Sequence, residues 1–518
     1  MAAHGSSATA TPGKKAGSPG RSSVSHPAIR NAAANNHSRR LRPTAGRSRV
    51  NPLRNNLTLN LMRLIVSLMA GVLTLLAAPA IASAQQSPKI SLVRDAETEN
   101  TIRYFAAPLL KAAGLNPQSL RVHLVLDDRM NAFVAGGQRI FINTGLLRSA
   151  ESPDAVIGVL AHETGHIAGG HLAKMQENLR SASAQSIIAL VLGAAAAVAT
   201  GEPEAAIAGA TMGQSIGQRS FLRYTSANES AADLAALSYL DKTEQSARGL
   251  LEVLESLQDQ ELLSGQRQDP YLRTHPLSQE RIATVRQHMS KSRYSERPTN
   301  PNLDLLHRRV RGKLNGYVDP PSRTLSRYAA DDPDIEARYA RIQAFIKLHR
   351  TTDALAIVDG LIESSPNDMF FHEVKGDILY RAGQIADSLP PYRRAIQLVE
   401  QSNGELPLIR LSLAQSLLQI PSRDTAAEAL DQLKVVADYE PWTPRVWRLM
   451  ATSYGRLDDF GGAAYALAEE AMLVGDRAGA SRNVARALEQ LPPDSPLRER
   501  ALDIQNLLGE GGKGDGKG

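Results

Sequence analysis

The amino-acid sequence predicts an α+β protein that is mostly helical, with a small mixed domain followed by an α-solenoid. Two short β-type segments, 122–128 and 139–143, lie among amphipathic helical segments such as 96–115. Beyond about residue 335, helical segments recur with a period near 34 residues. A chain of 518 residues is long enough for two or more domains, each with its own core.

The first 84 residues differ in charge from the rest of the chain. They contain 11 of the 59 Lys and Arg residues and none of the 53 Asp and Glu residues. The remainder is therefore slightly acidic, which removes the main compositional support for nucleic-acid binding. Residues 1–60 are rich in Ser, Ala, Asn, Pro and Arg, and this composition predicts a disordered basic leader. Two interpretations of this leader stay open: a gene-model extension, with Met62 as a candidate true start, or a translated segment.

Residues 61–84 have the three parts of a secretory signal peptide. Arg63 gives a positive flank, 64–78 form an apolar run, and Ala82-Ser83-Ala84 is a small-residue site that predicts cleavage after Ala84. A membrane anchor is the alternative, but the run is shorter than the ~20 apolar residues of a spanning helix. The chain has no cysteine, so an exported form has no disulfides and can bind metal only through His and carboxylates.

The mixed domain is predicted at 85–290, and local signals indicate its elements. Gly136-Gly137 marks a turn within 131–137, between the two strands. Ser152-Pro153-Asp154 is a capping signal for the next helix, and 224–242 predicts a further one. Charged, Pro-containing sequence at 291–334 predicts a linker.

Residues 186–217 are dominated by Ala, Gly, Ile, Leu and Met and predict a helical hairpin broken near 200–204. Each half is about 14 residues long, which is too short to span a bilayer. Two interpretations stay open. The hairpin is either a buried element or lid over a cleft, or a peripheral contact with a membrane surface.

The C-terminal region, 335–510, is predicted to contain helix–turn–helix units that start near 335, 369, 407 and 444, with a capping pair at 478–508. The period and the small residues at fixed positions, such as Ala354 and Ala395, resemble tetratricopeptide repeats. Such an array predicts a concave surface for binding other polypeptides. A helical bundle without repeat logic is the alternative, and 511–518 form a Gly-rich tail.

The segment His162-Glu163-Thr164-Gly165-His166 is an H-E-x-x-H sequence on a predicted helix. His162 and His166 differ by about 40° around the helix and lie one turn apart. Two imidazoles can then reach one zinc ion from the same face, with Glu163 beside them to polarise water. The alternative is that these are ordinary surface histidines on a helix.

Three more residues follow from this arrangement. His171 lies about 180° around the helix from His162, which predicts that it points away from the metal and is a core or supporting residue. A catalytic zinc needs a third protein ligand, and Glu229 is the best candidate. Asp233 lies one turn after Glu229, where it could hydrogen-bond a ligand histidine. A solvated helix face is the alternative for this pair.

The segments AHETGHIAGGH, NESAAD and NAFVAGG together resemble the M48 metallopeptidase family. The resemblance implies one zinc ion per chain, a gluzincin-like domain, and a general base, a supporting acid and a strand that receives substrate. Matched residue by residue, the ligands are His162, His166 and Glu229, the base is Glu163, the supporting acid (also described as a proton donor) is Asp233, and the strand candidates are Asn131, Ala132 and Phe133.

The stretch YLRTHPLSQERI also matches this family and adds His275 and Arg281. We hypothesise that His275 occupies the fourth zinc position at rest and keeps the enzyme latent. A helix-entry role beside Pro276 is the alternative for His275.

The order of signal peptide, peptidase and repeats is similar to that of periplasmic members of the family. The resemblance implies a periplasmic zinc endopeptidase in quality control of misassembled outer-membrane proteins, with the repeats binding these clients or the β-barrel assembly machinery. The alternative is a chaperone or scaffold for outer-membrane protein assembly with structural zinc and little proteolysis. Glu163 argues against that alternative, whereas His275 as a committed fourth ligand would favour it.

Overall fold

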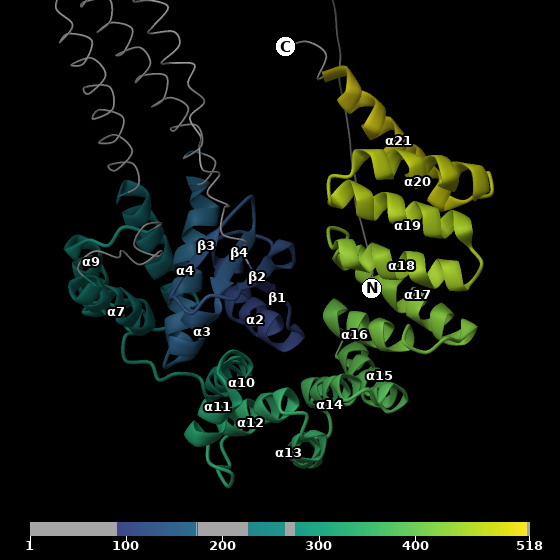
Figure 1. Cartoon of the computed structure of the whole chain (residues 1–518). Coiled ribbons are helices and arrows are strands. Elements are labelled where there is room, and N and C mark those ends of the chain that lie inside the picture. Colours follow the sequence, from purple (N-terminus) through teal and green to yellow (C-terminus); the bar gives the residue numbers. More distant parts are fainter. Residues whose placement is uncertain (1–90, 172–173, 175–225, 265–274, 403, 515–518) are drawn as a thin grey trace, which may run out of the picture. The chain divides into compact units, whose positions relative to one another are not determined.

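A computed structural model describes residues 91–171, 174, 226–264, 275–402 and 404–514. These residues belong to one compact unit, 88–518, and the predicted leader, signal peptide and 186–217 hairpin lie outside them. The fold is α+β and mostly helical, as predicted (Figure 1). Within the described residues, none of the helices has the length and apolar character that a membrane crossing needs.

The mixed domain is built on a four-stranded sheet with the order β1-β2-β4-β3. The central strands β2 and β4 are parallel, with Val122 opposite Ile140, and the two edge strands pair antiparallel to them. β2 ends at Val125, before the predicted limit, and the backbone N–H of Asp127 instead donates to the Thr144 hydroxyl at 3.2 Å. The strands are β1 (Leu92–Val93), β2 (Arg121–Val125), β3 (Ala132–Val134) and β4 (Arg139–Asn143).

Helices pack around this sheet and share one hydrophobic cluster with it. α2 begins after Asp95, whose carboxylate accepts from the Thr98 backbone N–H, and it packs on α4. A further helix runs through 226–242, close to the predicted range. The remaining helices are α2 (Ala96–Ala112), the 3-10 turn η1 (Pro117–Ser119), α3 (Thr144–Ser149), α4 (Pro153–Gly169), α7 (Arg248–Ser264) and α9 (Gln279–Met289).

The predicted linker at 291–334 is wrong as a description of this segment. It contains α10 (Pro301–Val318) and α11 (Pro321–Arg327), and Val310 and Leu314 of α10 belong to the hydrophobic cluster of the mixed domain. Pro301 and Pro321, two of the prolines that suggested a linker, stand at the first position of α10 and α11, where a missing N–H costs nothing.

From residue 335 onward, successive helices pair and each pair packs on the next. The first four pairs begin at 335, 369, 407 and 444, as the repeat spacing predicted, and the template alanines Ala354 and Ala395 are buried. Their classification as tetratricopeptide repeats stays a prediction. The helices are α12 (Ile335–Lys347), α13 (Thr351–Ser364), α14 (Met369–Arg381), α15 (Ile385–Gln401), α16 (Pro407–Leu417), α17 (Arg423–Tyr439), α18 (Pro444–Arg456), α19 (Phe460–Leu473), α20 (Arg477–Gln490) and α21 (Pro496–Gly514).

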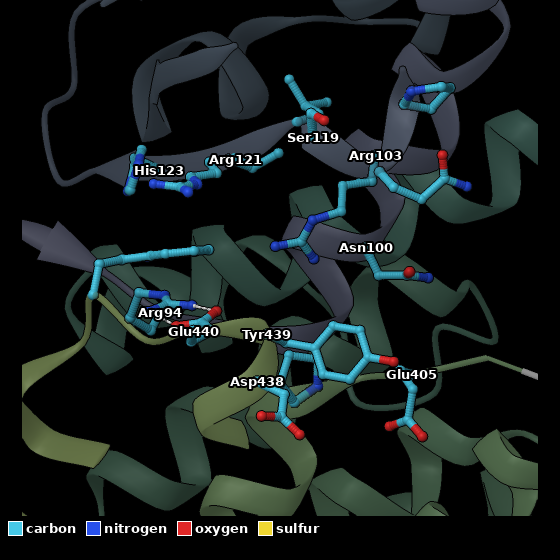
Figure 2. A pocket seen from close by; sticks show the side chains of 16 residues that line it. Arg94, Asn100, Arg103, Ser119, Arg121, His123, Glu405, Asp438, Tyr439 and Glu440 are labelled. Atoms are coloured by element: carbon cyan, nitrogen blue, oxygen red, sulfur yellow. Dashed lines mark hydrogen bonds and ion pairs between the residues drawn. The ribbon is translucent and has the colours of Figure 1, made fainter. Parts of the chain in front are cut away.

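This helical array contacts the mixed domain beside α2 and β2. Arg94 donates to the carboxylate of Glu440 at 2.9 Å, and the Arg121 guanidinium lies 3.4 Å from the ring centroid of Trp442. These residues line a cavity of about 480 Å³, with arginines on the α2 and β2 side and acidic residues on the array side (Figure 2). The two parts therefore meet through charge-complementary contacts.

Candidate metal centre

Helix α4 carries His162, Glu163 and His166 into the interior of the mixed domain. It begins after Ser152, the predicted cap, whose hydroxyl accepts a backbone N–H. The apolar residues of its first turns are buried against the sheet and α7. Because the helix is covered over most of its surface, its polar residues are buried as well, and His162 and Glu163 are 0% exposed.

The helix at 226–242 brings Glu229 and Asp233 against α4. The two helices approach closely at Gly165, where an added Cβ would lie 2.8 Å from the carbonyl oxygen of Ala232. Glycine at the fourth position of the H-E-x-x-H segment is thus required by the packing that completes the site.

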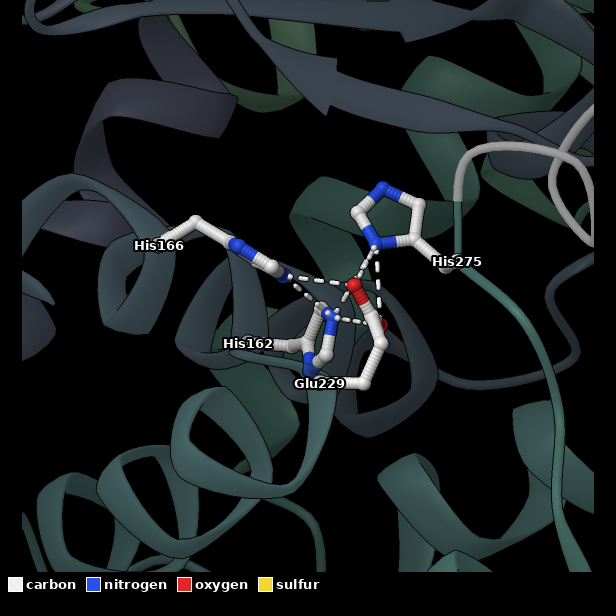
Figure 3. A group of neighbouring side chains, drawn as sticks. All are labelled: His162, His166, Glu229 and His275. Carbon is white, nitrogen blue, oxygen red and sulfur yellow. Dashed lines mark hydrogen bonds and ion pairs between the residues drawn. The ribbon is translucent and has the colours of Figure 1, made fainter. Parts of the chain in front are cut away.

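Four side chains direct donor atoms toward a common point (Figure 3). His162 Nε2 lies 3.0 Å from His166 Nε2, and Glu229 oxygens lie 3.2 and 3.3 Å from these two nitrogens. His275 Nδ1 is 3.3 Å from His162 Nε2 and 3.1 Å from Glu229 Oε2. All four residues are buried, and their donor atoms lie within 4.8 Å of one another.

These spacings fit a tetrahedral metal ion. Bonds of about 2.0–2.1 Å to His nitrogen and carboxylate oxygen place the donor atoms of a tetrahedral site about 3.3 Å apart. The contacts of His162 Nε2 with the other three residues, at 3.0, 3.2 and 3.3 Å, are close to that spacing, and the whole set of donor atoms lies within 4.8 Å. Imidazole and carboxylate are donors that zinc accepts. Among the described residues, this is the one group of its kind.

Asp233 and Arg281 support the ligand residues through hydrogen bonds and ion pairs. Asp233 Oδ1 lies 2.8 Å from His162 Nδ1, so the imidazole presents its other nitrogen to the site. Arg281 donates to Asp233 at 2.6 Å and lies 3.1 Å from Glu229 Oε2, and its own side chain is buried. The sequence singled out Arg281 only as part of a matching stretch, because nothing local shows that its guanidinium reaches two carboxylates on another helix.

Burial and hydrogen bonding change the pKa values in this cluster in opposite directions. Burial acts to lower the pKa of His162, but hydrogen bonds to Asp233 and Glu229 outweigh it and raise the pKa to about 9. Burial acts to raise the pKa of Glu229, yet hydrogen bonds from His162, His166 and His275 hold it far below its ordinary range. Glu229 is therefore an ionised carboxylate surrounded by imidazoles.

Glu163 stands apart from these partners. Neither of its buried carboxylate oxygens accepts a hydrogen bond within the described part of the chain, and Oε1 lies 3.4 Å from His275 Nε2. Burial raises the pKa of Glu163 to about 7. A buried carboxylate that is left without hydrogen bonds beside four converging donors is poised to exchange a proton.

The strand candidates lie in or directly before β3, a strand that contacts α4. Ala132 and Phe133 belong to β3, an edge strand of the sheet that pairs with β4 and contacts α4, and Asn131 directly precedes it. Ala132 is fully buried, while Phe133 stacks on Phe141 with ring centroids 5.0 Å apart. β3 therefore offers a strand edge beside α4.

The prediction that His171 points away from the site is wrong. It assumed that α4 continues, whereas α4 ends at Gly169 and Gly170 adopts a left-handed conformation with φ of 61°. The chain turns, and His171 Nδ1 comes within 3.1 Å of His166 Nδ1. The Gly169-Gly170 pair was the local signal that a helix end, and not a continued helix, precedes His171.

Comparison with known proteins agrees with this geometry. Residues 95–289 match the model of peptidase family M48, and this range contains every residue of the metal centre. The match covers the mixed domain and does not extend into the helical array. This is the family that the sequence motifs resembled.

Similar proteins include two named beta-barrel assembly-enhancing protease. The one from Escherichia coli K12 is 25% identical over 313 residues, covering 60% of this chain and 62% of that protein. The one from Yersinia pestis is 24% identical over 336 residues, covering 64% of this chain and 66% of that protein. The match therefore spans no more than about two thirds of either relative. Metalloprotease YcaL of E. coli is 28% identical over 192 residues, covering 36% of this chain and 70% of that protein.

Proposed function

We propose that this protein is a zinc-dependent endopeptidase that hydrolyses peptide bonds. The observation that carries the proposal is the convergence of His162, His166 and Glu229 on one point, with the carboxylate of Glu163 beside them. These three residues would hold one zinc ion per chain. Bound zinc supplies a Lewis acid that polarises a carbonyl group and makes water more acidic.

The chain's own residues then divide the remaining work. Glu163 accepts the proton of the attacking water and transfers it to the leaving amine, because no hydrogen bond from the described residues engages its oxygens. Asp233 is a positioning residue: it holds His162 through Nδ1, and Arg281 holds Asp233 in turn. An extended substrate adds along the edge of β3 at residues 131–133, as peptides commonly add to an exposed strand.

His275 acts as a latch in this proposal. Its Nδ1 lies among the donor atoms at the fourth position, where it keeps substrate away from the centre. Removing it by His275→Ala is expected to raise proteolysis while zinc stays bound by the other three residues. Unchanged or lower proteolysis in this variant would reject the latch.

The cellular role is proposed from the relatives and from the leader. The name of these relatives supports a role in outer-membrane β-barrel assembly, and the predicted signal peptide supports export to the periplasm. We infer that the enzyme degrades unfolded or misassembled outer-membrane proteins. The helical array binds these clients or the β-barrel assembly machinery, since stacked helix pairs present extended binding surfaces.

The position of His275 among the donor atoms favours a second function. If His275 is a permanent fourth ligand, the site is closed and zinc is structural, as in a chaperone or scaffold for outer-membrane proteins. Glu163→Gln distinguishes the two functions in cells. A scaffold keeps its function in outer-membrane protein assembly with this variant, and a protease loses it.

The deciding experiment measures zinc per chain in the mature protein from Gln85, together with cleavage of an unfolded β-barrel protein. We expect one zinc ion per chain, cleavage that stops with a chelator and returns with zinc, and loss of zinc in Glu229→Ala. Asp241→Ala is the matched control, because it removes a carboxylate from the same helix at the protein surface. Little zinc in the parent, or zinc unaffected by Glu229→Ala, would reject the proposed ligand set.

A further inference from the structure

The segment Gly169-Gly170-His171 folds back onto the metal centre. His171 is half-buried, and its Nδ1 lies 3.1 Å from Nδ1 of His166. The two rings meet edge to face, with centroids 5.0 Å apart and an angle of 85° between their planes. Because only the Nε2 atom of His166 faces the other donors, this contact engages the nitrogen that points away from them.

Both glycines are needed for this contact, each for its own reason. An added Cβ on Gly169 would lie 2.3 Å from Nε2 of His171, so any larger residue there displaces the His171 ring. A Cβ on Gly170 would meet no atom within 4 Å, but this residue has a φ of 61°, which L-residues with side chains adopt at a cost. The segment is thus built so that His171 returns to His166.

Each histidine of the H-E-x-x-H segment contacts a supporting residue through its Nδ1 atom. His162 Nδ1 is engaged by Asp233 at 2.8 Å, and His166 Nδ1 by His171 at 3.1 Å. A metal-bound imidazole keeps its remaining proton on the distal nitrogen and donates it to an acceptor, which fixes the tautomer and the ring orientation. Asp233 is a carboxylate, whereas a neutral His171 accepts through the lone pair of Nδ1.

We propose that His171 is the positioning residue of His166, which accepts the Nδ1 proton of His166 and aims its Nε2 at the metal. This inference rests on the proposed zinc-dependent function and adds a residue to it. In this assignment the acceptor for His166 is the neutral His171, and the acceptor for His162 is the ionised Asp233. The two supporting residues therefore add only one negative charge to the centre.

The test compares zinc dissociation constants, measured by competition with a chromophoric chelator on the mature chain. His171→Phe keeps an aromatic ring but has no acceptor, and we expect it to weaken zinc binding by about 10–100-fold. Gly169→Ala is expected to weaken it as well, because the new methyl group displaces His171. His171→Gln, which keeps an acceptor, should restore affinity close to that of the parent, and His288→Phe, on α9 beside Asp241, should leave it unchanged.

The Co²⁺-substituted protein gives an independent readout. We expect its visible absorption bands to shift in His171→Phe and to return toward the parent in His171→Gln, since the orientation of His166 changes and is then restored. Zinc binding and a Co²⁺ spectrum that match the parent in His171→Phe would overturn this inference alone. Absence of zinc from the parent would overturn the proposed function as well, so the two failures are distinguishable.

Discussion

The chain contains two buried clusters of charged and polar side chains that are built in opposite ways. In the cluster between α2, α10, α12 and α14, Arg309 contacts Glu97 at 2.5 Å and Asp368 at 2.6 Å, and Lys313 contacts Asp95 at 2.6 Å. Each cation faces a carboxylate of another element. In the metal centre, three imidazoles and Glu229 instead direct their donor atoms at one another.

The difference separates a cluster that stabilises the fold from one that prepares chemistry. Charges of opposite sign offset much of the cost of burial within the Arg309 cluster. In the metal centre, the converging nitrogen and oxygen donors do not fully offset the cost of their own burial. A bound cation would offset the rest, so this arrangement fits a metal ion. Packing of α2 on both α10 and α4 joins the two clusters through one helix.

The largest expected effect is on the rate of peptide cleavage. It comes from changing Glu163, whose carboxylate neither cluster neutralises. Glu163→Gln should lower the rate of peptide cleavage by about 10²–10⁴-fold, because the amide cannot accept a proton. Zinc content should stay at the parent value. Glu373→Gln is the matched control, since Glu373 is also buried and one of its oxygens accepts no hydrogen bond from the residues that the structure describes, but it lies in the array. Cleavage that persists in Glu163→Gln would show that another group is the base.

The second prediction concerns the Arg309 cluster, in which buried charges of opposite sign are paired. Arg309→Met should lower the free energy of unfolding by about 3–5 kcal/mol, because it removes the nearer cation of the buried Glu97 carboxylate and leaves only the Lys313 ammonium, at 3.5 Å. The neighbouring Arg308 pairs with Asp334 at the surface, so Arg308→Met should cost only about 0–1 kcal/mol.

Denaturant unfolding measures both changes. Adding Glu97→Gln to Arg309→Met should recover part of the loss, because the buried negative charge that Arg309 neutralised is then removed. Equal losses in the two arginine variants would mean that the buried cluster is no more important to stability than a surface ion pair.

The third prediction weakens the support behind one ligand. Asp233→Asn should reduce zinc affinity by about 10–100-fold, since an amide holds the Nδ1 proton of His162 less strongly than a carboxylate. Asp241→Asn, on the same helix but in contact with His288 at the surface, should bind zinc like the parent. Competition with a chelator measures both, and equal affinities would remove Asp233 from the positioning role.

The smallest expected effect concerns acid stability. Burial acts to raise the pKa of Asp95, but the ammonium of Lys313 outweighs it, and the pKa in the folded protein is lowered. A carboxylate of this kind stabilises the fold above its unfolded pKa of about 3.9, and this contribution is lost as the pH falls through the folded pKa. Asp95→Asn should therefore lower stability at neutral pH and reduce the loss on acidification below about pH 4. Thermal melting between neutral and acidic pH measures this, and parallel curves for parent and variant would contradict it.

Local patterns predicted most of the elements that hold the site. The cap at Ser152 and the starts of the repeat helices at 335 and 369 follow from residues within one or two turns. The failures have the same origin. The segment at 291–334 looked like a linker because prolines that open a helix resemble prolines that break one, and His171 was placed by a helix that had already ended at Gly169.

The sequence by itself determined the chemistry of helix α4. His162 and His166 share a face, with Glu163 beside them, because a spacing of four residues is one helical turn wherever the helix lies. Only the tertiary structure decided that Glu229, His275 and Arg281, which are far apart in the chain, meet at that face. Their convergence depends on how helices pack, including the close approach at Gly165, and helix packing is not written in any local period.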